Sequence, residues 1–283
     1  MYVKESRTIT PRLRLRATLT MTRLVWKIIQ VYRDWPTVFL ERLHFIKPQP
    51  IVYRLRDGVE LSLQAGSRDR AIIDEVFLNQ VYTCSPGFKI RDGWVVADVG
   101  GHKGIFAVFA ATRARDVKVY TFEPSPENFA RLSHNIQRNK LSNVKAFNVA
   151  VGGKDGESTL HLHRESGQNS LLQRSDPALQ PIGDTKVETW SLKHVLQTIG
   201  SPVNLLKMDI EGMEYETLFS CSAGDLQTVE RIALEYHDDW VHTSHHVTEL
   251  LDFLSGRGFR TQLSPGRPIL IAERPSGNSL VDG

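Results

Sequence analysis

Apolar and polar positions follow two different rhythms along this chain. Before residue 94, the stretch IVYRLRDGVELSL at 51–63 alternates apolar with polar residues on both sides of Asp57-Gly58. Alternation around an Asp-Gly pair predicts a β-hairpin, because these two residues favour the tight turn between antiparallel strands. The next segment, 70–82, has apolar residues at helical spacing and predicts an amphipathic helix.

From Trp94 onward, short apolar runs alternate with longer amphipathic segments. They predict strands at 95–99, 117–122, 144–151, 203–209, 229–236, 259–263 and 268–273, and helices at 104–113, 126–139, 191–199, 213–220 and 245–257. This alternation is typical of a doubly wound α/β fold with a mostly parallel sheet. The last two strands resemble a hairpin, so we expect a Rossmann-like seven-stranded sheet with an antiparallel last strand. Residues 156–172 predict an inserted strand and a polar loop.

Length and composition favour one large domain with an appendage. The chain has 283 residues, of which 41% are hydrophobic, and we expect a helical arm at 1–48 and the α/β domain at 49–283. Within that domain, 49–93 form an entry hairpin and helix. Cys84 and Cys221 lack paired spacing, which argues against a disulfide scaffold or a cysteine zinc site. No run is long enough to span a membrane, and Lys27 interrupts the candidate signal sequence, so a cytoplasmic location is expected.

The arm differs from the rest of the chain in charge. Residues 1–47 carry ten Lys or Arg and three acids, whereas the other residues carry 25 bases and 29 acids. In the arm, Leu24, Ile28 and Tyr32 fall at helical spacing. Three interpretations stay open: a helix packed on its own domain or on a second subunit, a helix at a membrane surface, or a mobile arm. Because the body is mildly acidic, we expect no nucleic-acid partner.

The end of the first α/β strand carries an acid and three glycines. In ADVGGHKG, Asp98 is followed by Gly100, Gly101 and Gly104, and Glu123 ends the next strand 19 residues after Gly104. A glycine turn at this edge of the sheet lets the backbone approach a ligand closely. An acid at the end of the next strand can accept hydrogen bonds from both hydroxyls of a ribose. The pattern therefore predicts an adenosine-containing ligand.

Two details distinguish S-adenosylmethionine from a nicotinamide cofactor. Val99 stands where the dinucleotide pattern requires glycine. Asp98 would repel a pyrophosphate but suits the ammonium group of an amino-acid ligand. In addition, the chain contains no Tyr-x-x-x-Lys pair of the short-chain reductase kind.

Five segments carry a resemblance to the FkbM family of S-adenosylmethionine-dependent methyltransferases. They are VVADVGGHKGIFAVFAA, VYTFEPSPENFARLSHNIQRN, NVAVGGKDG, LLKMDIEGMEYETL and IALEYHD, in the family's order and spacing between about 90 and 240. The resemblance implies a Rossmann-like class I methyltransferase fold, O-methylation as the usual chemistry, and S-adenosylmethionine as cofactor. It implies cofactor contacts at Asp98, Gly100, Gly101, His102, Gly104, Glu123, Pro124, Asn148, Ala150 and Asp209. At His102-Lys103, family members more often carry Asn and an apolar residue.

Candidates for acceptor chemistry lie at the ends of the fourth and fifth strands. NLLKMDIEG ends in Asp209 and Glu211, and RIALEYHDDW delivers Glu235 and His237 on one face. A hydroxyl acceptor needs a base or a metal to take its proton. We assign catalytic roles to Asp209, Glu211 and His237, with His237 as the candidate base. The alternatives are helix-capping acids for Asp209 and Glu211, and a hydrogen-bonded core histidine or a substrate contact for His237.

A metal is a further alternative at the same strand ends. Asp209, Glu211 and Glu235 could supply oxygen ligands for Mg²⁺, whereas His237 as a ligand would suit Mn²⁺ better. In the polar loop, Gln168, Asn169 and Ser170 resemble a segment near the family's pocket and are candidate acceptor or cofactor contacts.

The predicted function is methyl transfer from S-adenosylmethionine to a hydroxyl of a sugar, glycolipid or secondary metabolite. The expected partner is therefore a small-molecule, glycan or lipid acceptor, with peripheral membrane contact or dimer contact through 1–47 as an option. The alternatives are a nicotinamide-dependent oxidoreductase, a non-catalytic adenosine-binding module and a nucleic-acid methyltransferase. The last would require a basic body and an Asn/Asp-Pro-Pro-Tyr/Phe type motif, and the chain has neither.

Overall fold

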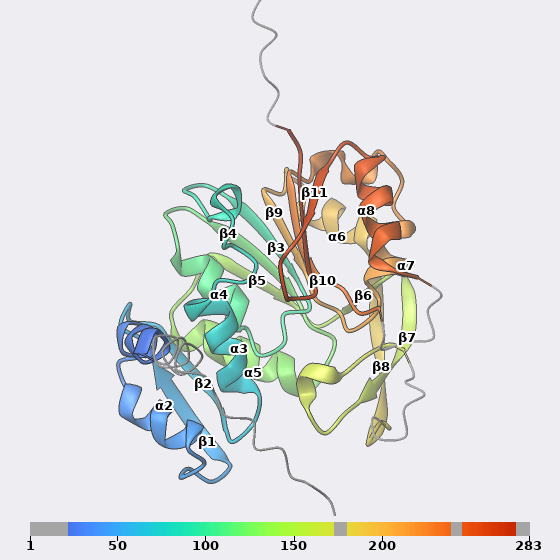
Figure 1. The fold of residues 1–283 in the computed structure, drawn as a ribbon. Coiled ribbons are helices and arrows are strands. Elements are labelled where there is room, and N and C mark those ends of the chain that lie inside the picture. The colour runs from blue at the N-terminus through green and yellow to red at the C-terminus, as the bar shows by residue number, and fades with distance from the viewer. Residues whose placement is uncertain (1–21, 173–179, 239–244, 276–283) are drawn as a thin grey trace, which may run out of the picture.

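The computed structural model describes residues 22–172, 180–238 and 245–275, and a seven-stranded sheet lies at its centre (Figure 1). The strands are β3 (Val95–Val99), β4 (Lys118–Phe122), β5 (Val144–Phe147), β9 (Leu205–Met208), β10 (Arg231–Glu235), β11 (Arg260–Leu263) and β12 (Ile269–Glu273). Their order is β11-β12-β10-β9-β3-β4-β5. β12 runs antiparallel to β10 and β11, whereas β10, β9, β3, β4 and β5 pair in parallel. The predicted mixed sheet with an antiparallel last strand is confirmed.

Helices cover both faces of this sheet. α4 (Ile105–Thr112) and α5 (Pro126–Arg138) lie on one face, and α6 (Leu192–Ile199), α7 (Glu214–Phe219) and α8 (Val247–Ser255) lie on the other (Figure 1). Adjacent positions of β3 point to opposite faces: Val96 packs in the core with α4, and Ala97 packs in the core with α6 and α7. Every residue of β3 is buried, which is why the central strands are nearly continuous apolar runs in the sequence.

A second, three-stranded sheet departs from the sequence prediction. It contains β6 (Ala150–Gly152), β7 (Gly156–Leu162) and β8 (Gly183–Ser191) in the order β6-β8-β7. The single strand predicted at 144–151 is wrong, because β5 and β6 belong to different sheets. The chain turns between them at Asn148, whose side chain donates to the carbonyl oxygens of Glu123 and Pro124 at 2.8 and 3.1 Å. The inserted strand is β7, whereas β8 was not predicted.

The N-terminal part forms a smaller body beside α5. Residues 22–31 are helical, and α2 (Trp35–Arg42) precedes the antiparallel hairpin of β1 (Gln49–Arg54) and β2 (Glu60–Ala65), as predicted. The helix expected at 70–82 is shorter: α3 (Asp69–Ile73) continues as the π-helical η1 (Asp74–Leu78), and two 3₁₀ turns, η2 (Pro86–Phe88) and η3 (Ser166–Gln168), lie in later loops. A third 3₁₀ turn, η5 (Asp225–Thr228), precedes β10.

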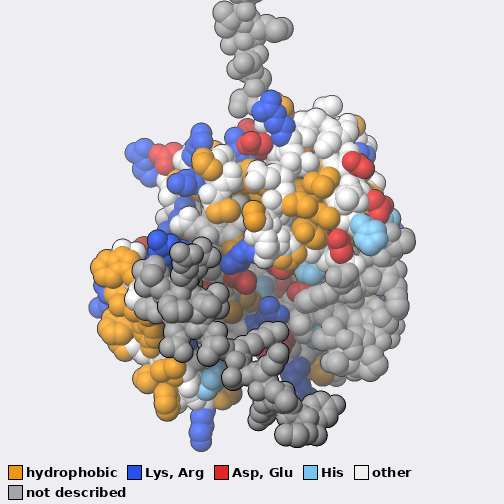
Figure 2. Space-filling model, in the orientation of Figure 1, with side chains coloured by type: hydrophobic (Ala, Val, Ile, Leu, Met, Phe, Trp, Pro, Cys, Tyr) orange, Lys and Arg blue, Asp and Glu red, His pale blue; other side chains and the backbone are white. Residues whose placement is uncertain are grey.

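The described part of the basic arm packs on the chain's own core. Ile28 and Tyr32 are fully buried, and the Tyr32 hydroxyl donates to Asp74 Oδ1 at 2.9 Å. On the outer side, hydrophobic side chains gather over the α2 end of the molecule (Figure 2). Within the described ranges, every helix is too short or too polar to traverse a bilayer.

Candidate active site

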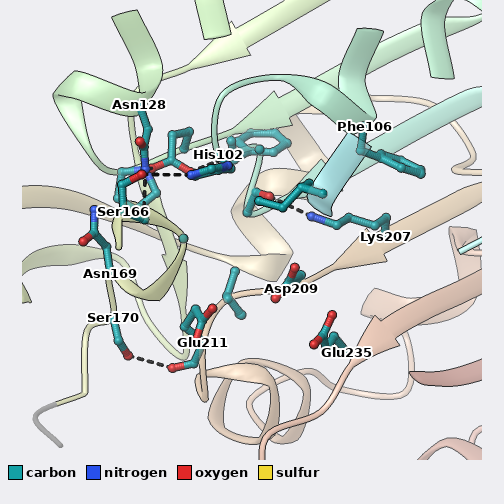
Figure 3. Close-up of a pocket in the computed structure, with 18 of the residues that line it drawn as sticks. His102, Phe106, Asn128, Ser166, Asn169, Ser170, Lys207, Asp209, Glu211 and Glu235 are labelled. Carbon is teal, nitrogen blue, oxygen red and sulfur yellow. Dashed lines mark hydrogen bonds between the residues drawn. The ribbon is translucent and has the colours of Figure 1, made fainter. Parts of the chain in front are cut away.

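A cavity opens at the carboxyl ends of β3, β4, β9 and β10, where parallel strands deliver their last residues to one edge of the sheet. Figure 3 shows His102, Asn128 and Ser166 together at one end of this cavity and Asp209, Glu211 and Glu235 at the other. We call these the turn end and the carboxylate end. The two groups that the sequence predicts for cofactor and acceptor therefore share one cavity.

The glycine turn is built by close backbone approach. Gly100 has a φ of 85°, and a Cβ there would lie 1.7 Å from the carbonyl oxygen of Asp209. A Cβ on Gly101 would lie 2.2 Å from Thr121 Oγ1. Both positions require glycine for this reason, and the turn rests directly on the end of β9.

A buried ion pair lies beneath the turn. Lys207 Nζ donates to the Gly100 carbonyl oxygen at 2.7 Å and lies 3.2 Å from Asp98 Oδ1. Thr121 Oγ1 donates to the other Asp98 oxygen at 2.9 Å. Burial lowers the pKa of Lys207, but the attraction of Asp98 and Asp209 outweighs it and raises that pKa, so the lysine is charged at neutral pH. The charge of Asp98 is thus matched within the protein.

Glu123 closes the turn from the side of β4. Its Oε2 accepts from the His102 N–H at 2.8 Å, and its Oε1 accepts from the Ser125 N–H at 2.9 Å and Asn128 Nδ2 at 3.3 Å. A carboxylate has about four acceptor sites, so three bonds leave room for about one further donor. Burial raises the pKa of Glu123 to about 7.

Most of the predicted cofactor contacts line the cavity, and three lie behind its wall. The lining includes Gly100, Gly101, His102, Glu123, Pro124, Ala150 and Asp209. Asp98 lies under the turn, Gly104 packs against Leu132, and Asn148 holds the backbone of Glu123 and Pro124. These three support the turn from outside the cavity.

Two lining residues at the turn end keep polar atoms without a hydrogen-bond partner. They are His102 Nδ1 and Asn128 Oδ1. The other ends of the two side chains meet at Ser166, whose Oγ lies 3.1 Å from His102 Nε2 and whose carbonyl accepts from Asn128 Nδ2 at 3.2 Å. Burial, with the nearby charge of Lys103, lowers the pKa of His102 to about 4, so its ring is neutral and offers either a donor or an acceptor.

At the carboxylate end, the structure brings all three predicted catalytic residues together. Asp209, Glu211 and His237 each offer an atom within 4.8 Å of the others, and all three line the cavity. Glu211 has a φ of 52°, an uncommon backbone conformation for a residue with a side chain. Ser170 Oγ donates to the Glu211 carbonyl oxygen at 2.7 Å and secures this turn.

His237 is held by carboxylates on several sides. Its Nδ1 lies 3.2 Å from Glu214 Oε1, and its Nε2 lies 3.8 Å from Glu211 Oε2. Burial alone would lower the pKa of His237, but Glu214, Glu211 and Asp209 outweigh it and raise the pKa to about 10. The imidazole is therefore a cation at neutral pH.

Glu235 and Asp209 share one tyrosine hydroxyl. The Tyr82 oxygen lies 3.1 Å from Asp209 Oδ2 and 3.2 Å from Glu235 Oε2. One phenolic hydrogen serves only one carboxylate, so both contacts are satisfied when Glu235 carries a proton of its own. Burial, with the charge of Asp209, raises the pKa of Glu235 to about 7. At neutral pH this group exchanges a proton readily.

Several residues of the site were not identified from the sequence. Lys207 had a usable signal, because a lysine inside the apolar run NLLKM is unusual. Glu214 resembles an ordinary acid in the first turn of a helix, although it is fully buried. Tyr82 had no local signal, since its partner Glu235 lies 153 positions away. Of the loop candidates, Asn169 and Ser170 line the cavity.

A family model and two curated relatives identify a methyltransferase domain in this chain. Residues 98–261, more than half of the chain, match the Methyltransferase FkbM domain. The 31-O-demethyl-FK506 methyltransferase FkbM of Streptomyces tacrolimicus is 27% identical over 233 residues, which cover 73% of this chain and 87% of that protein. The hexuronic acid methyltransferase AglP of Haloferax volcanii is 26% identical over 144 residues, which cover 50% of this chain and 56% of that protein. A SAM dependent methyltransferase from Aquifex aeolicus aligns over 72% of this chain and 96% of that chain, with 13% identity and a TM-score of 0.38.

Proposed function

Because the chain belongs to the FkbM methyltransferase family and is an S-adenosylmethionine-dependent methyltransferase, we propose that it methylates a hydroxyl of a sugar or secondary metabolite. The observation that carries this proposal is Glu235, which lines the same cavity as the glycine turn and whose pKa is raised to about 7 by burial and the charge of Asp209. The name of one relative, a 31-O-demethyl-FK506 methyltransferase, supports an oxygen acceptor, and the name of the other, a hexuronic acid methyltransferase, supports a sugar.

The turn end fits the cofactor. Gly100 and Gly101 let the turn pack directly on Asp209 and Thr121, and His102 Nδ1 and Asn128 Oδ1 have no hydrogen-bond partner in the described structure. We assign the adenosine end to these atoms and to the remaining acceptor site of Glu123. When bound, the cofactor supplies a methyl group activated by its sulfonium. The protein's part is to hold the acceptor oxygen aligned with that methyl group.

We assign Glu235 as the base that takes the proton of the acceptor hydroxyl. A pKa of about 7 suits a base at neutral pH, because a proton is then accepted and released easily. The Tyr82 hydroxyl supports this role because both of its contacts, to Glu235 and to Asp209, are satisfied once Glu235 has taken the proton.

His237 takes a different role from the base predicted from the sequence. With a pKa of about 10, its ring is already protonated at neutral pH. It therefore cannot accept a further proton from the acceptor hydroxyl. We propose that its Nε2 donates a hydrogen bond to the acceptor oxygen and that Glu214 fixes the ring. Glu211 balances the charge of the imidazolium at 3.8 Å.

A divalent cation is the alternative way to activate the acceptor. The ligand-capable atoms of Asp209, Glu211 and His237 lie within 4.8 Å of one another, whereas Glu235, the third oxygen ligand expected from the sequence, is not in this group. A histidine among the ligands suits Mn²⁺ better than Mg²⁺. The carboxylate end therefore has a composition that fits such an ion.

Two measurements test the proposal. Labelled S-adenosylmethionine is incubated with a panel of glycans, lipids and small alcohols, and label in an ether-linked methyl group is the expected result. Glu235→Gln should lower the transfer rate by about 100-fold or more, the usual effect of losing a positioned base, whereas the exposed Glu157→Gln should leave it unchanged.

Treatment with EDTA separates the two mechanisms. Under the proposed base mechanism, the treated protein keeps its rate. Loss of activity that Mn²⁺ restores would overturn the assignment of Glu235 and identify His237 as a ligand. Label found only on nitrogen would overturn the hydroxyl acceptor.

A further inference from the structure

The exposed apolar side chains of this protein are concentrated in one short segment, residues 22–48. Six large hydrophobic side chains are exposed among the described residues, and all but Ile182 belong to this segment. They are Trp26 (62% exposed), Trp35 (37%), Leu40 (48%), Leu43 (62%) and Phe45 (74%). A cluster of this kind on one face marks an interaction surface.

The opposite face of the same segment is anchored to the protein. Ile28, Tyr32 and Val38 are buried in the core, and buried Glu41 accepts a hydrogen bond from Tyr53 at 2.7 Å. The exposed apolar side chains are therefore presented outward by an ordered support, over α2 and the neighbouring helix (Figure 2).

The exposed charged side chains of the segment 22–48 have one sign. The exposed bases of the segment are Arg23, Lys27, Arg33 and Lys47. Of its two acids, Asp34 pairs with Arg54 at 3.1 Å, and Glu41 is buried. The preceding residues, 1–21, add five Lys or Arg and one acid in the sequence.

We propose that residues 22–48 dock this protein on an anionic lipid bilayer. Tryptophan and aliphatic side chains flanked by bases suit the boundary between headgroups and acyl chains, where the apolar groups insert and the cations meet lipid phosphates. A second copy fits this face less well. In a two-fold dimer the same patch meets itself, which would bring these cations together without an exposed acid to match them.

Flotation of the full-length protein with vesicles tests the docking surface. We expect binding to vesicles of phosphatidylcholine with about one quarter phosphatidylglycerol, and at least about tenfold weaker binding to pure phosphatidylcholine. The triple variant Trp26→Ser, Leu43→Ser, Phe45→Ser should lose at least about tenfold in bound fraction. Ile182→Ser removes an equally exposed apolar side chain elsewhere and should bind as the wild type does.

Folding and oligomeric state are measured on the same samples. S-adenosylhomocysteine binding should be unchanged in the triple variant, which keeps this test independent of the proposed acceptor chemistry. If the triple variant fails to fold, Arg23→Gln with Lys27→Gln replaces it, with weaker binding to the anionic vesicles expected. Equal binding of wild type and a folded variant would overturn the proposal. So would a wild-type dimer that the triple variant converts to monomer in light scattering, since a second copy would then occupy the surface.

Discussion

Replacing Lys207 with methionine tests the buried pair beneath the glycine turn. The side chains of Lys207 and Asp98 are 4% and 0% exposed, so solvent does not compensate Asp98 when its partner is removed. Asp98 then keeps only the Thr121 hydroxyl, and the Gly100 carbonyl loses a charged donor. Breaking a buried ion pair at one partner costs about 3–5 kcal/mol, because the other charge stays buried and unmatched. We expect Lys207→Met to lower the free energy of unfolding by about that amount.

Urea unfolding of four proteins measures this effect. They are the wild type, Lys207→Met, Asp98→Asn and the double variant. The double variant should be more stable than Lys207→Met alone, because it buries no unmatched charge. Lys145→Met, an exposed lysine on β5, is the control and should change stability by less than about 0.5 kcal/mol. A loss under about 1 kcal/mol for Lys207→Met, or strict additivity in the double variant, would refute the reasoning.

Three further predictions concern the cavity. The transfer rate should rise as the pH passes about 7, because Glu235 accepts a proton only when ionised, and a Glu235→Gln variant with the same rise would contradict this. Gly100→Ala should weaken S-adenosylhomocysteine binding at least about tenfold in calorimetry, since a Cβ would lie 1.7 Å from the Asp209 carbonyl oxygen; unchanged affinity would argue against the turn as cofactor cradle. Glu123→Gln keeps the size of the side chain but loses its charge, so it should weaken S-adenosylhomocysteine binding about tenfold. NAD should bind neither the wild type nor Glu123→Gln, and tight NAD binding by either would contradict the cofactor assignment.

The main sheet and the glycine turn were predictable because their signals are local. Strands buried on both faces appear as apolar runs, and helices between them appear as amphipathic segments, so the seven strands could be placed from periodicity. The carboxyl ends of parallel strands meet at one edge. For this reason Asp209 and His237 were expected in one cleft although 28 positions separate them. In the structure, a carboxylate oxygen of Asp209 and a ring nitrogen of His237 lie within 4.8 Å of each other.

The rest depended on contacts that a single segment does not reveal. The apolar run at 144–151 gave no sign that its second half joins another sheet, because both halves are apolar. β8 is mostly polar, and only Val187 and Thr189 are buried among its residues. The base role of His237 was assigned from its ordinary pKa, whereas the buried carboxylate of Glu214, brought beside it by folding, changes that pKa.

The loop at 163–172 has a consequence for redesign of this enzyme. Near its start, Ser166 contacts His102 and Asn128 at the turn end, and four positions later Ser170 holds the Glu211 carbonyl at the carboxylate end. One short segment thus carries contacts to both ends of the cavity. Exchanging this loop between relatives to alter acceptor preference would change cofactor affinity in the same step. An acceptor library on this scaffold should therefore keep Ser166 fixed and vary Asn169 and its neighbours, so that selection for a new acceptor does not select against the cofactor.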